Sequence, residues 1–480
     1  MVRSVKRFPY RFGGLVAPAK VVALLLACAL AVVCQCRAQD PPDPWQQMAL
    51  IVERIQPPIF PQKDFVVTEF GARGDSVSDC SEAFSRAIEA CSKGGGGRVV
   101  VPLGIFLTGS IHLKSNVNLH LEQGATIRFH RDPAKYLPMV LARWEGVECI
   151  NYSPFIYAYG DSTIAITGEG TLDGYADSLN WWPWKGNKKN GWKEGAPNQV
   201  EARNRLFDMG ERGVPVEERK FGEGFYLRPN FIEPYRCRNI LIEGVTIIRS
   251  PMWEIHPVLC ENVTVRNVHI DSHGPNNDGC DPESSRDVLI AGCYFDTGDD
   301  CIAIKSGRNN DGRRLNTPSE NIVIQNCTFK DGHGGITIGS EISGGTRNVF
   351  AEDCGMESPV LYSALRIKSN AVRGGTIENI NLRRINVGLV DKAVIDVDLF
   401  YEEGRDGPFL PTIRNITIEQ MKVKTCKVAL NLVGYKEAPL QNIRLRDCEF
   451  VKVQNGYKVE NVEGLEITGT TLNGKELTPP

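Results

Sequence analysis

Residues 237–247 read Cys-Arg-Asn-Ile-Leu-Ile-Glu-Gly-Val-Thr-Ile, and residues 260–270 repeat the pattern as Cys-Glu-Asn-Val-Thr-Val-Arg-Asn-Val-His-Ile. Each unit has two short β-branched runs, alternating between inward and outward positions and separated by a polar pair. Similar units start near residues 285, 319, 346, 377, 413, 440 and 462. A strand–turn repeat at intervals of 22 to 36 residues predicts one coil of a right-handed parallel β-helix per unit.

The third position of nearly every unit is asparagine. The counterparts of Asn239 are Asn262, Asp287, Asn321, Asn348, Asn379, Asn415, Asn442 and Gly464. Regular asparagines at one position are explained by inward-facing side-chain ladders between stacked coils, which the main alternative fold, a β-sandwich, does not require. A 3.6-residue periodicity is absent, which argues against a helical solenoid. We therefore predict an all-β, right-handed parallel β-helix.

Two segments depart from the repeat. A helix is predicted over residues 80–92, with Asp79 as its cap and an apolar stripe of Ala83, Phe84, Ala87, Ile88 and Cys91. It is expected to close the amino-terminal end, because an uncapped solenoid end exposes its core. Residues 175–225 hold Trp181, Trp182, Trp184 and Trp192 among many charges. This insertion is expected to be either a packed surface loop or a wall beside a cleft.

The first residues have the order of a secretory signal peptide, which places the protein outside the cell or in a periplasm. Five basic residues precede the apolar run 21–33, and Cys36-Arg37-Ala38 follows, so cleavage is expected after Ala38. A membrane anchor is the alternative, but 13 residues fall short of the roughly 20 that span a bilayer. A lipidated start at Cys28 would leave too short an apolar run before it. We expect residues 39–480 to form a single parallel β-helix domain.

Charge and cysteine content narrow the class of partner. Loss of residues 1–38 removes six basic and no acidic side chains, which moves the formal net charge from −3 to −9. A protein this acidic does not bind nucleic acid or anionic membranes through its overall field, and an anionic substrate needs a local cationic pocket.

Twelve of the 15 cysteines remain after loss of residues 1–38, and they lack the spacing of zinc ligands. Stacked buried thiols are expected at Cys293, Cys327 and Cys448, which share one repeat position. Cys80 and Cys91 lie on one predicted helix ~16 Å apart, too far to pair.

Three carboxylates follow neighbouring coils. Asn277-Asp278-Gly279 ends one coil and Thr297-Gly298-Asp299-Asp300 ends the next, so 22 residues separate Asp278 from Asp300. Stacking predicts that these side chains lie together, and mutual repulsion should raise at least one pKa. A carboxylic acid with a raised pKa can protonate a leaving oxygen while an ionised neighbour activates water. A calcium site is the alternative, because clustered carboxylates also bind hard cations.

Cationic residues are expected at the same face. His333, between glycines one coil further on, can hydrogen-bond a carboxylate and tune its proton affinity. Arg366 and Lys368 point to the same side of a strand, because residues i and i+2 do so. Beside three carboxylates they supply the positive pocket that a uronate needs, and the arginine fork suits a carboxylate.

The motifs Asn277-Asp278, Gly298-Asp299-Asp300, Gly332-His333-Gly334 and Arg366-Ile367-Lys368 resemble, in order and approximate spacing, the four signatures of the polygalacturonase family, glycoside hydrolase family 28. The resemblance covers nearly the whole mature chain, including 65–75 and 228–257. It implies a right-handed parallel β-helix and hydrolysis of α-1,4-galacturonosyl bonds of pectin or polygalacturonate, with inversion and without metal or cofactor. Asn276-Asn277-Asp278 departs from the commoner Asn-Thr-Asp, but the aspartate is intact.

Carried over by motif, Asp299 would be the general acid, and Asp278 and Asp300 would position and deprotonate the attacking water. His333 would assist the acid through a hydrogen bond. The residues expected to bind substrate are Arg366, Lys368, Lys305, Arg308 and Asn277.

The stretch Lys305-Ser306-Gly307-Arg308 is similar to bacterial exo-acting members, in which basic loop residues recognise a chain end. Together with the insertion it favours a cleft closed at one side and therefore exo action. The expected partner is an anionic polysaccharide or its oligomers, bound by a monomer, with neither nucleic acid nor membrane. Three alternatives remain: a rhamnogalacturonan-backbone hydrolase of the same family, a calcium-dependent pectate lyase, and a non-catalytic carbohydrate-binding solenoid.

Overall fold

The computed structural model describes residue 9 and residues 43–479. The predicted signal peptide therefore lies outside the described residues, apart from Pro9. The chain forms two compact units, Met1–Gln47 and Met48–Pro480. Helix α2 (Pro44–Arg54) begins in the first and ends in the second. No helix in the described part is both long and apolar enough to cross a membrane.

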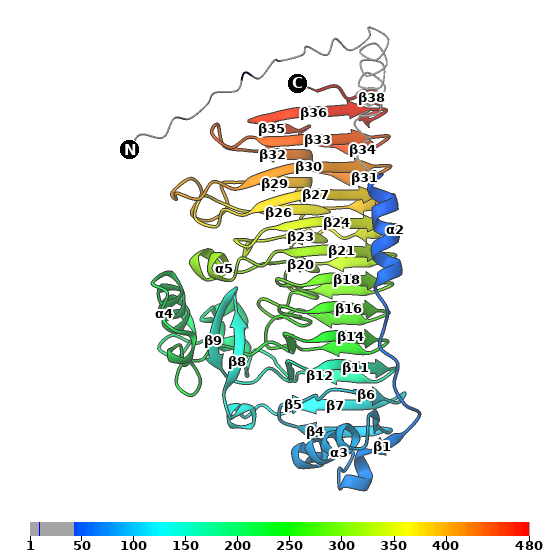
Figure 1. Ribbon diagram of the computed structural model, residues 1–480. Coiled ribbons are helices and arrows are strands. Elements are labelled where there is room, and N and C mark those ends of the chain that lie inside the picture. Colours follow the sequence, from blue (N-terminus) through cyan, green and yellow to red (C-terminus); the bar gives the residue numbers. More distant parts are fainter. Residues whose placement is uncertain (1–8, 10–42, 480) are drawn as a thin grey trace, which may run out of the picture. The chain divides into compact units, whose positions relative to one another are not determined.

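The second unit is a right-handed parallel β-helix, which confirms the predicted fold. Its strands stack in chain order, from blue to red in Figure 1, and each complete coil gives one strand to each of three faces. The first face is a 13-stranded sheet. It comprises β1 (Asp64–Val66), β3 (Gly97–Val101), β6 (Val117–Leu121), β11 (Ser162–Gly168), β14 (Arg238–Glu243), β16 (Glu261–Arg266), β18 (Arg286–Ala291), β21 (Ser319–Gln325), β24 (Thr346–Glu352), β27 (Thr376–Arg383), β30 (Thr412–Glu419), β33 (Leu440–Arg446) and β36 (Val462–Thr468).

The second face is a 14-stranded sheet, parallel except for its last pair. It comprises β2 (Asp75–Asp79), β4 (Gly104–Thr108), β7 (Ala125–Phe129), β12 (Thr171–Asp173), β15 (Thr246–Ile248), β17 (His269–Ser272), β19 (Tyr294–Thr297), β22 (Thr328–Asp331), β25 (Gly355–Glu357), β28 (Asn386–Leu389), β31 (Lys422–Cys426), β34 (Glu449–Val453), β37 (Thr471–Leu472) and β38 (Lys475–Glu476).

The third face is built from two shorter parallel sheets joined by isolated bridges through Ile255 and Cys280. One contains β5 (Ile111–His112), β10 (Ile156–Tyr159) and β13 (Ile232–Tyr235). The other contains β20 (Ile302–Ile304), β23 (Ile336–Ile338), β26 (Leu365–Lys368), β29 (Ala393–Asp398), β32 (Val428–Val433) and β35 (Lys458–Glu460). This face matters for function because its strands follow the turns that carry the three aspartates.

The repeated asparagines form a ladder, but not the inward-facing one that we predicted. Asn321, Asn348 and Asn379 have φ of 57–58°. Asparagine tolerates this left-handed conformation better than most residues, which explains its recurrence. Each side-chain amide donates to the oxygen of the preceding rung, at 3.0 Å for Asn348 to Asn321 and 3.1 Å for Asn379 to Asn348. These side chains are only half-buried, because the left-handed turn directs them to the corner of the coil and not into its core.

The core is a stack of apolar side chains that repeats from coil to coil. On the third face Ile302, Ile336, Leu365 and Ile395 lie in register, and each is fully buried. All twelve cysteines of the described residues are buried free thiols, which confirms stacked thiols at the shared repeat position. An isolated coil would expose this apolar strip, so stacking of neighbours is what stabilises the fold.

The amino-terminal end is closed by helix α3 (Ser81–Lys93), which packs against β1 and β3. It starts one residue later than predicted, and its apolar stripe is buried as expected. The Asp79 carboxylate accepts hydrogen bonds from the backbone N–H of Ser81 at 2.9 Å and from its hydroxyl at 2.5 Å. Asp79 therefore binds the first turn from one position further out than a regular N-cap.

Irregular segments project from one side of the coil stack (Figure 1). They are the antiparallel hairpin of β8 (Val140–Trp144) and β9 (Val147–Asn151), and helices α4 (Val200–Glu211) and α5 (Asn309–Leu315). The described residues also contain five short 3-10 turns, which are η1 (Val67–Phe70), η2 (Pro133–Tyr136), η3 (Trp182–Lys185), η4 (Lys188–Asn190) and η5 (Val216–Glu218). Trp144, Leu206 and Trp253 belong to a second apolar cluster under these segments, so the projection is packed.

Candidate active site

The structure brings the three predicted aspartates together. Asp278 lies in the turn that leads from β17 to Cys280, the residue that bridges to the third face. Asp299 and Asp300 lie in the corresponding turn of the next coil, between β19 and β20. The backbone N–H of Gly279 donates to the carbonyl of Asp300 at 3.0 Å, which holds the two coils in register. One carboxylate oxygen from each aspartate lies within 4.8 Å of the other two. The Asp299 side chain is 21% exposed, whereas those of Asp278 and Asp300 are buried.

Each carboxylate has a different set of partners. Asp300 accepts hydrogen bonds from Lys368 Nζ at 2.6 Å and from the Thr337 hydroxyl at 3.0 Å. Asp299 pairs with His333 Nδ1 at 2.9 Å. Among the described residues the Asp278 carboxylate has only Lys305 as a partner, whose Nζ is 3.5 Å from Oδ2, and none bonds to its buried Oδ1. The cluster is therefore surrounded by cations but not fully paired.

The environments push the proton affinities apart. Burial, with the nearby charges of Asp281 and Asp299, raises the pKa of Asp278 well above its usual range, as the clustering predicted. Burial acts in the same direction on Asp299, but the hydrogen bond and charge of His333 outweigh it and hold that pKa below its usual range. Burial opposes charge on His333, yet the bond to Asp299 raises the His333 pKa above its usual value. The Asp299–His333 pair therefore keeps one proton near neutrality.

The glycines around His333 are required by close contacts. A Cβ at Gly334 would lie 2.2 Å from the Thr337 hydroxyl and 3.0 Å from the Asp300 carboxylate. On its other side His333 stacks on Tyr362, with the ring centroids 4.7 Å apart. The ring is thus fixed between the acid cluster and an aromatic platform.

The aspartates lie in a cavity of about 220 Å³, here called the catalytic cavity. Lys305, Arg308 and Lys368 also line it, as the sequence predicted for basic groups. Nine lining residues were not predicted: Glu145, Lys185, Arg203, Trp253, Asn276, Ser340, Glu341, Tyr401 and Glu402. Lys185 and Arg203 come from the insertion of residues 175–225, which therefore forms a wall of the cavity. Its density of tryptophan and charge was the only signal of this role.

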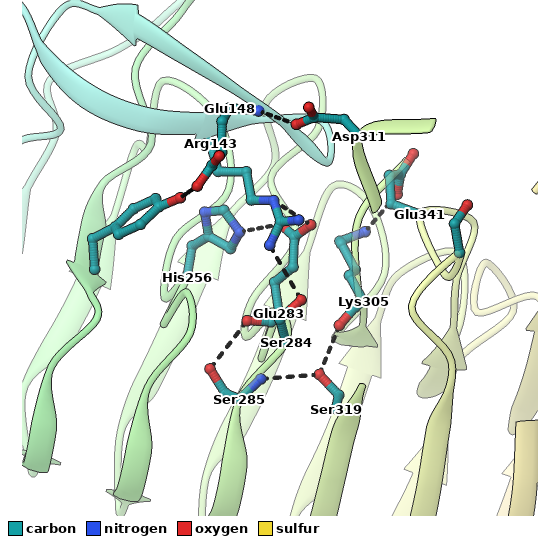
Figure 2. A network of polar contacts seen from close by, with 12 residues as sticks. Arg143, Glu148, His256, Glu283, Ser284, Ser285, Lys305, Asp311, Ser319 and Glu341 are labelled. Atoms are coloured by element: carbon teal, nitrogen blue, oxygen red, sulfur yellow. Dashed lines mark hydrogen bonds and ion pairs between the residues drawn. The ribbon is translucent and has the colours of Figure 1, made fainter. Parts of the chain in front are cut away.

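A polar network that includes Lys305 and Glu341 fixes one wall of the cavity (Figure 2). Lys305 Nζ lies 3.4 Å from Glu341 Oε2 and 4.3 Å from the Trp253 ring centroid. The backbone N–H of Arg308 donates to the Gly146 carbonyl at 2.9 Å. The backbone N–H of Glu148 donates to Asp311 at 2.9 Å. These bonds join the loop after β20 to the β8–β9 hairpin.

Deeper in the same network, Glu283 is held by two fully buried partners (Figure 2). Its carboxylate lies 2.7 Å from His256 Nε2 and 3.2 Å from Arg143 Nε. Burial alone opposes a charge on His256, but hydrogen bonds to Glu233 and Glu283 raise its pKa to about 9. These ion pairs join neighbouring coils below the cavity without a ligand, and removing one partner would leave the other charge buried and unpaired.

Two predicted substrate-binding residues are placed differently. Asn277 is fully buried and does not line the cavity. Its amide accepts from the Ser272 hydroxyl and the Gly274 N–H, and donates to two backbone carbonyls, so no capacity is left for a ligand. Arg366 is also outside the cavity lining, with its guanidinium 4.0 Å from Asp300 and 3.7 Å from Asp396. In a tight turn neighbouring residues point apart, and here Asn276 faces the cavity instead of Asn277.

The cluster geometry also bears on the calcium alternative. Carboxylate oxygens within 4.8 Å of one another satisfy the first requirement of a hard-cation site. However, Lys368 and Lys305 place ammonium groups 2.6 Å from Asp300 and 3.5 Å from Asp278, where a divalent cation would be repelled. The donor set fits acid–base chemistry better than metal binding.

Comparison with known proteins agrees with this geometry. A family model for glycosyl hydrolases of family 28 matches residues 222–472. A probable polygalacturonase of Vitis vinifera is 28% identical over 424 residues, which cover 83% of this chain and 77% of the relative. An exo-poly-alpha-D-galacturonosidase of Dickeya chrysanthemi is 26% identical over 381 residues, or 74% of this chain and 62% of the relative. The solved structure of a hyperthermoactive exopolygalacturonase from Thermotoga maritima matches with a TM-score of 0.87 and 47% identity, over 90% of this chain and 96% of that one.

Proposed function

This chain belongs to the glycosyl hydrolases of family 28, and from that premise we propose that it hydrolyses α-1,4-galacturonosyl bonds of polygalacturonate from a chain end. The observation that carries the proposal is the set of three carboxylates within 4.8 Å of one another in a cavity lined by five basic side chains. Carboxylates supply the acid–base chemistry, and the cations suit an anionic sugar.

In the proposed mechanism Asp299 protonates the glycosidic oxygen as the C1–O bond breaks. Its own pKa is low, so the proton is the one shared with His333 at 2.9 Å, and His333 becomes neutral as the proton passes through Asp299. Asp278 and Asp300 orient a water whose oxygen bonds to C1 and whose proton passes to this pair. The raised pKa of Asp278 makes it the stronger base once it is ionised.

The proposed stereochemical outcome is inversion. The carboxylate oxygens here approach within 4.8 Å, closer than the roughly 6.5–9.5 Å between carboxyl groups in most inverting glycosidases. That range applies where acid and base come from opposite sides of the sugar. Here adjacent residues of one turn, Asp299 and Asp300, contribute to both functions, so that range does not decide the outcome. Inversion requires that the water held by Asp278 and Asp300 attacks C1 from the face opposite the leaving oxygen.

Exo action is supported by the segments that wall the catalytic cavity. The insertion, the β8–β9 hairpin and the loop after β20 each add side chains to its lining, and a backbone hydrogen bond from Arg308 to Gly146 joins the last two. A closed wall admits a chain end but hinders binding along the middle of a polymer. Similarity to the exopolygalacturonase of Thermotoga maritima points the same way. We also propose that the enzyme is exported and acts as a monomer.

The test is the product profile of polygalacturonate digestion. We expect free monomer early, with little loss of viscosity, and no unsaturated, ultraviolet-absorbing ends. Asp299→Asn should lower turnover by several powers of ten while substrate binding persists. A rapid fall in viscosity would contradict exo action, and retained activity of Asp299→Asn would remove that residue as the acid. Unsaturated products would indicate a lyase.

A further inference from the structure

Charge is compensated unevenly around the catalytic cavity. Lys305, Arg308 and Lys368 each lie within 3.5 Å of a carboxylate oxygen. On the insertion side Arg203 pairs with Glu145 at 2.9 Å. Lys185 differs from all of these, because within the described residues no carboxylate oxygen lies within 4.0 Å of its ammonium. Its one hydrogen-bond acceptor is Oδ1 of Asn276, at 2.7 Å.

A second cation lies behind the same amide oxygen. Arg228 is fully buried, and its guanidinium donates to Asn276 Oδ1 at 2.8 Å. Its other acceptors are the Gln199 side chain and the carbonyls of Pro251 and Pro275, all of them neutral. Burial lowers the pKa of Arg228 to about 10 and also lowers that of Lys185, and in both cases it outweighs the more distant charge of Glu145. One neutral oxygen therefore separates two cations, and within the described residues neither has a carboxylate within 4.0 Å; Glu145, which pairs with Arg203, attracts both only from further away.

Lys185 is also held in place. It ends the turn η3, in which the Trp182 indole donates to the Ser250 carbonyl at 2.9 Å and Trp184 packs against the main core. An ammonium has three donors, of which Asn276 uses one. The remaining two are available in the cavity that also holds Asp278 and Asp299. A cation held this way loses little side-chain freedom when a ligand binds.

We propose that Lys185, supported by Arg228 through Asn276, binds the carboxylate of a galacturonate unit inside the catalytic cavity. This subsite is separate from Arg366 and Lys368, which already face the carboxylates of Asp396 and Asp300. The inference rests on the proposed function and adds a selectivity to it. A sugar acid supplies a carboxylate in direct contact, whereas a neutral hexose or a methyl-esterified unit leaves both cations without a paired anion.

The test compares binding of trigalacturonate and its fully methyl-esterified form by calorimetry, in the Asp299→Asn background so that the ligand is not cleaved. Lys185→Met should raise the Kd for trigalacturonate about 10- to 100-fold, which corresponds to about 1.4–2.8 kcal/mol, and leave the Kd for the ester nearly unchanged. Lys189→Met is the matched control, because Lys189 is exposed in the same insertion, and it should bind both ligands as the parent does. Lys185→Arg should keep most of the preference for the free acid.

Two results would overturn the inference. In one, Lys185→Met binds trigalacturonate as tightly as the parent; in the other, it weakens binding of acid and ester equally. Thermal melting of each variant separates loss of folding from loss of binding. If Lys185→Met unfolds, Lys185→Gln takes its place with the same expected outcomes. Hydrolysis by the unmodified enzyme is measured separately, so failure of this subsite is distinguishable from failure of the proposed function.

Discussion

Replacement of His333 by glutamine tests how the acid obtains its proton. In the native site His333 Nδ1 lies 2.9 Å from Asp299, the pKa of His333 is raised and that of Asp299 is lowered. The pair therefore keeps its proton to a pH above about 6.5, the ordinary value for histidine. Glutamine retains a donor to Asp299 but does not titrate. In His333→Gln the proton must be held by the Asp299 carboxyl alone, so the alkaline limb of the activity profile should move to lower pH.

The size of the shift follows from the bond that is lost. A hydrogen bond to a charged group contributes about 1.5–3 kcal/mol, which corresponds to about one to two pKa units. We therefore expect the alkaline limb to move by about one to two pH units, with a further drop of kcat at pH 7. The pair should stabilise the fold most between about pH 4 and 6.5. This stabilisation is lost as the pH rises through the raised pKa of His333, or falls through the lowered pKa of Asp299.

The assay is reducing-end release from trigalacturonate across the pH range, analysed as kcat/KM. His273→Gln is a matched control, because His273 Nε2 lies 2.9 Å from Asp296 in a similar pair outside the catalytic cavity. Its profile should match the native one. An unchanged alkaline limb in His333→Gln, or an equal shift in His273→Gln, would refute the proton-sharing scheme.

Three further predictions concern stability and metal dependence. Lys305→Met leaves buried acidic groups without their ammonium and should lower the free energy of unfolding by about 3–5 kcal/mol in urea titrations; a loss below ~1 kcal/mol would contradict the buried-pair description. Asn348→Ala loses ladder bonds and puts alanine at φ 58°, so it should be less stable than Asn348→Gly by about 1 kcal/mol, and the reverse ranking would show that the left-handed turn is not the constraint. Chelator should leave the release of reducing ends unchanged, because ammonium groups already lie against Asp278 and Asp300; activity lost to chelator and restored by calcium would reverse that conclusion.

The parts of the molecule that repeat were the predictable parts. The spacing of the asparagines fixes the coil length, and the coil length brings Asp278 beside Asp299 and Asp300. The prediction that the Asn348 side chain points into the core is wrong. Asparagine recurs at this position because it tolerates a left-handed turn, and not because the core needs a polar ladder. The periodicity of the sequence predicts where each strand lies, but it does not predict the backbone conformation of the turn between two strands.

Residues outside the repeat could not be placed. Lys185 and Arg203 reach the cavity because the insertion folds back onto the coil stack, and no spacing in the sequence encodes that contact. Asn276 lines the cavity in place of the predicted Asn277, because the Asn277 amide bonds to the backbone of a tight turn while its neighbour faces the cavity. The sequence therefore located the carboxylates and offered a wall beside the cleft as one of two roles for the insertion, but it did not identify the residues that form the wall.

The central claim is that three clustered aspartates hydrolyse the galacturonosyl bond by direct attack of water. Proton NMR of trigalacturonate during the first turnovers tests it most directly, because the anomer formed at the cleaved bond is seen before it equilibrates. Single displacement on an α-linkage predicts the β-anomer first, with no vinylic H4 signal. The α-anomer first would indicate a covalent glycosyl-enzyme intermediate, which is the mechanism of glycosidases whose two carboxyl groups lie close together. A vinylic signal would indicate elimination. Either result would contradict the account.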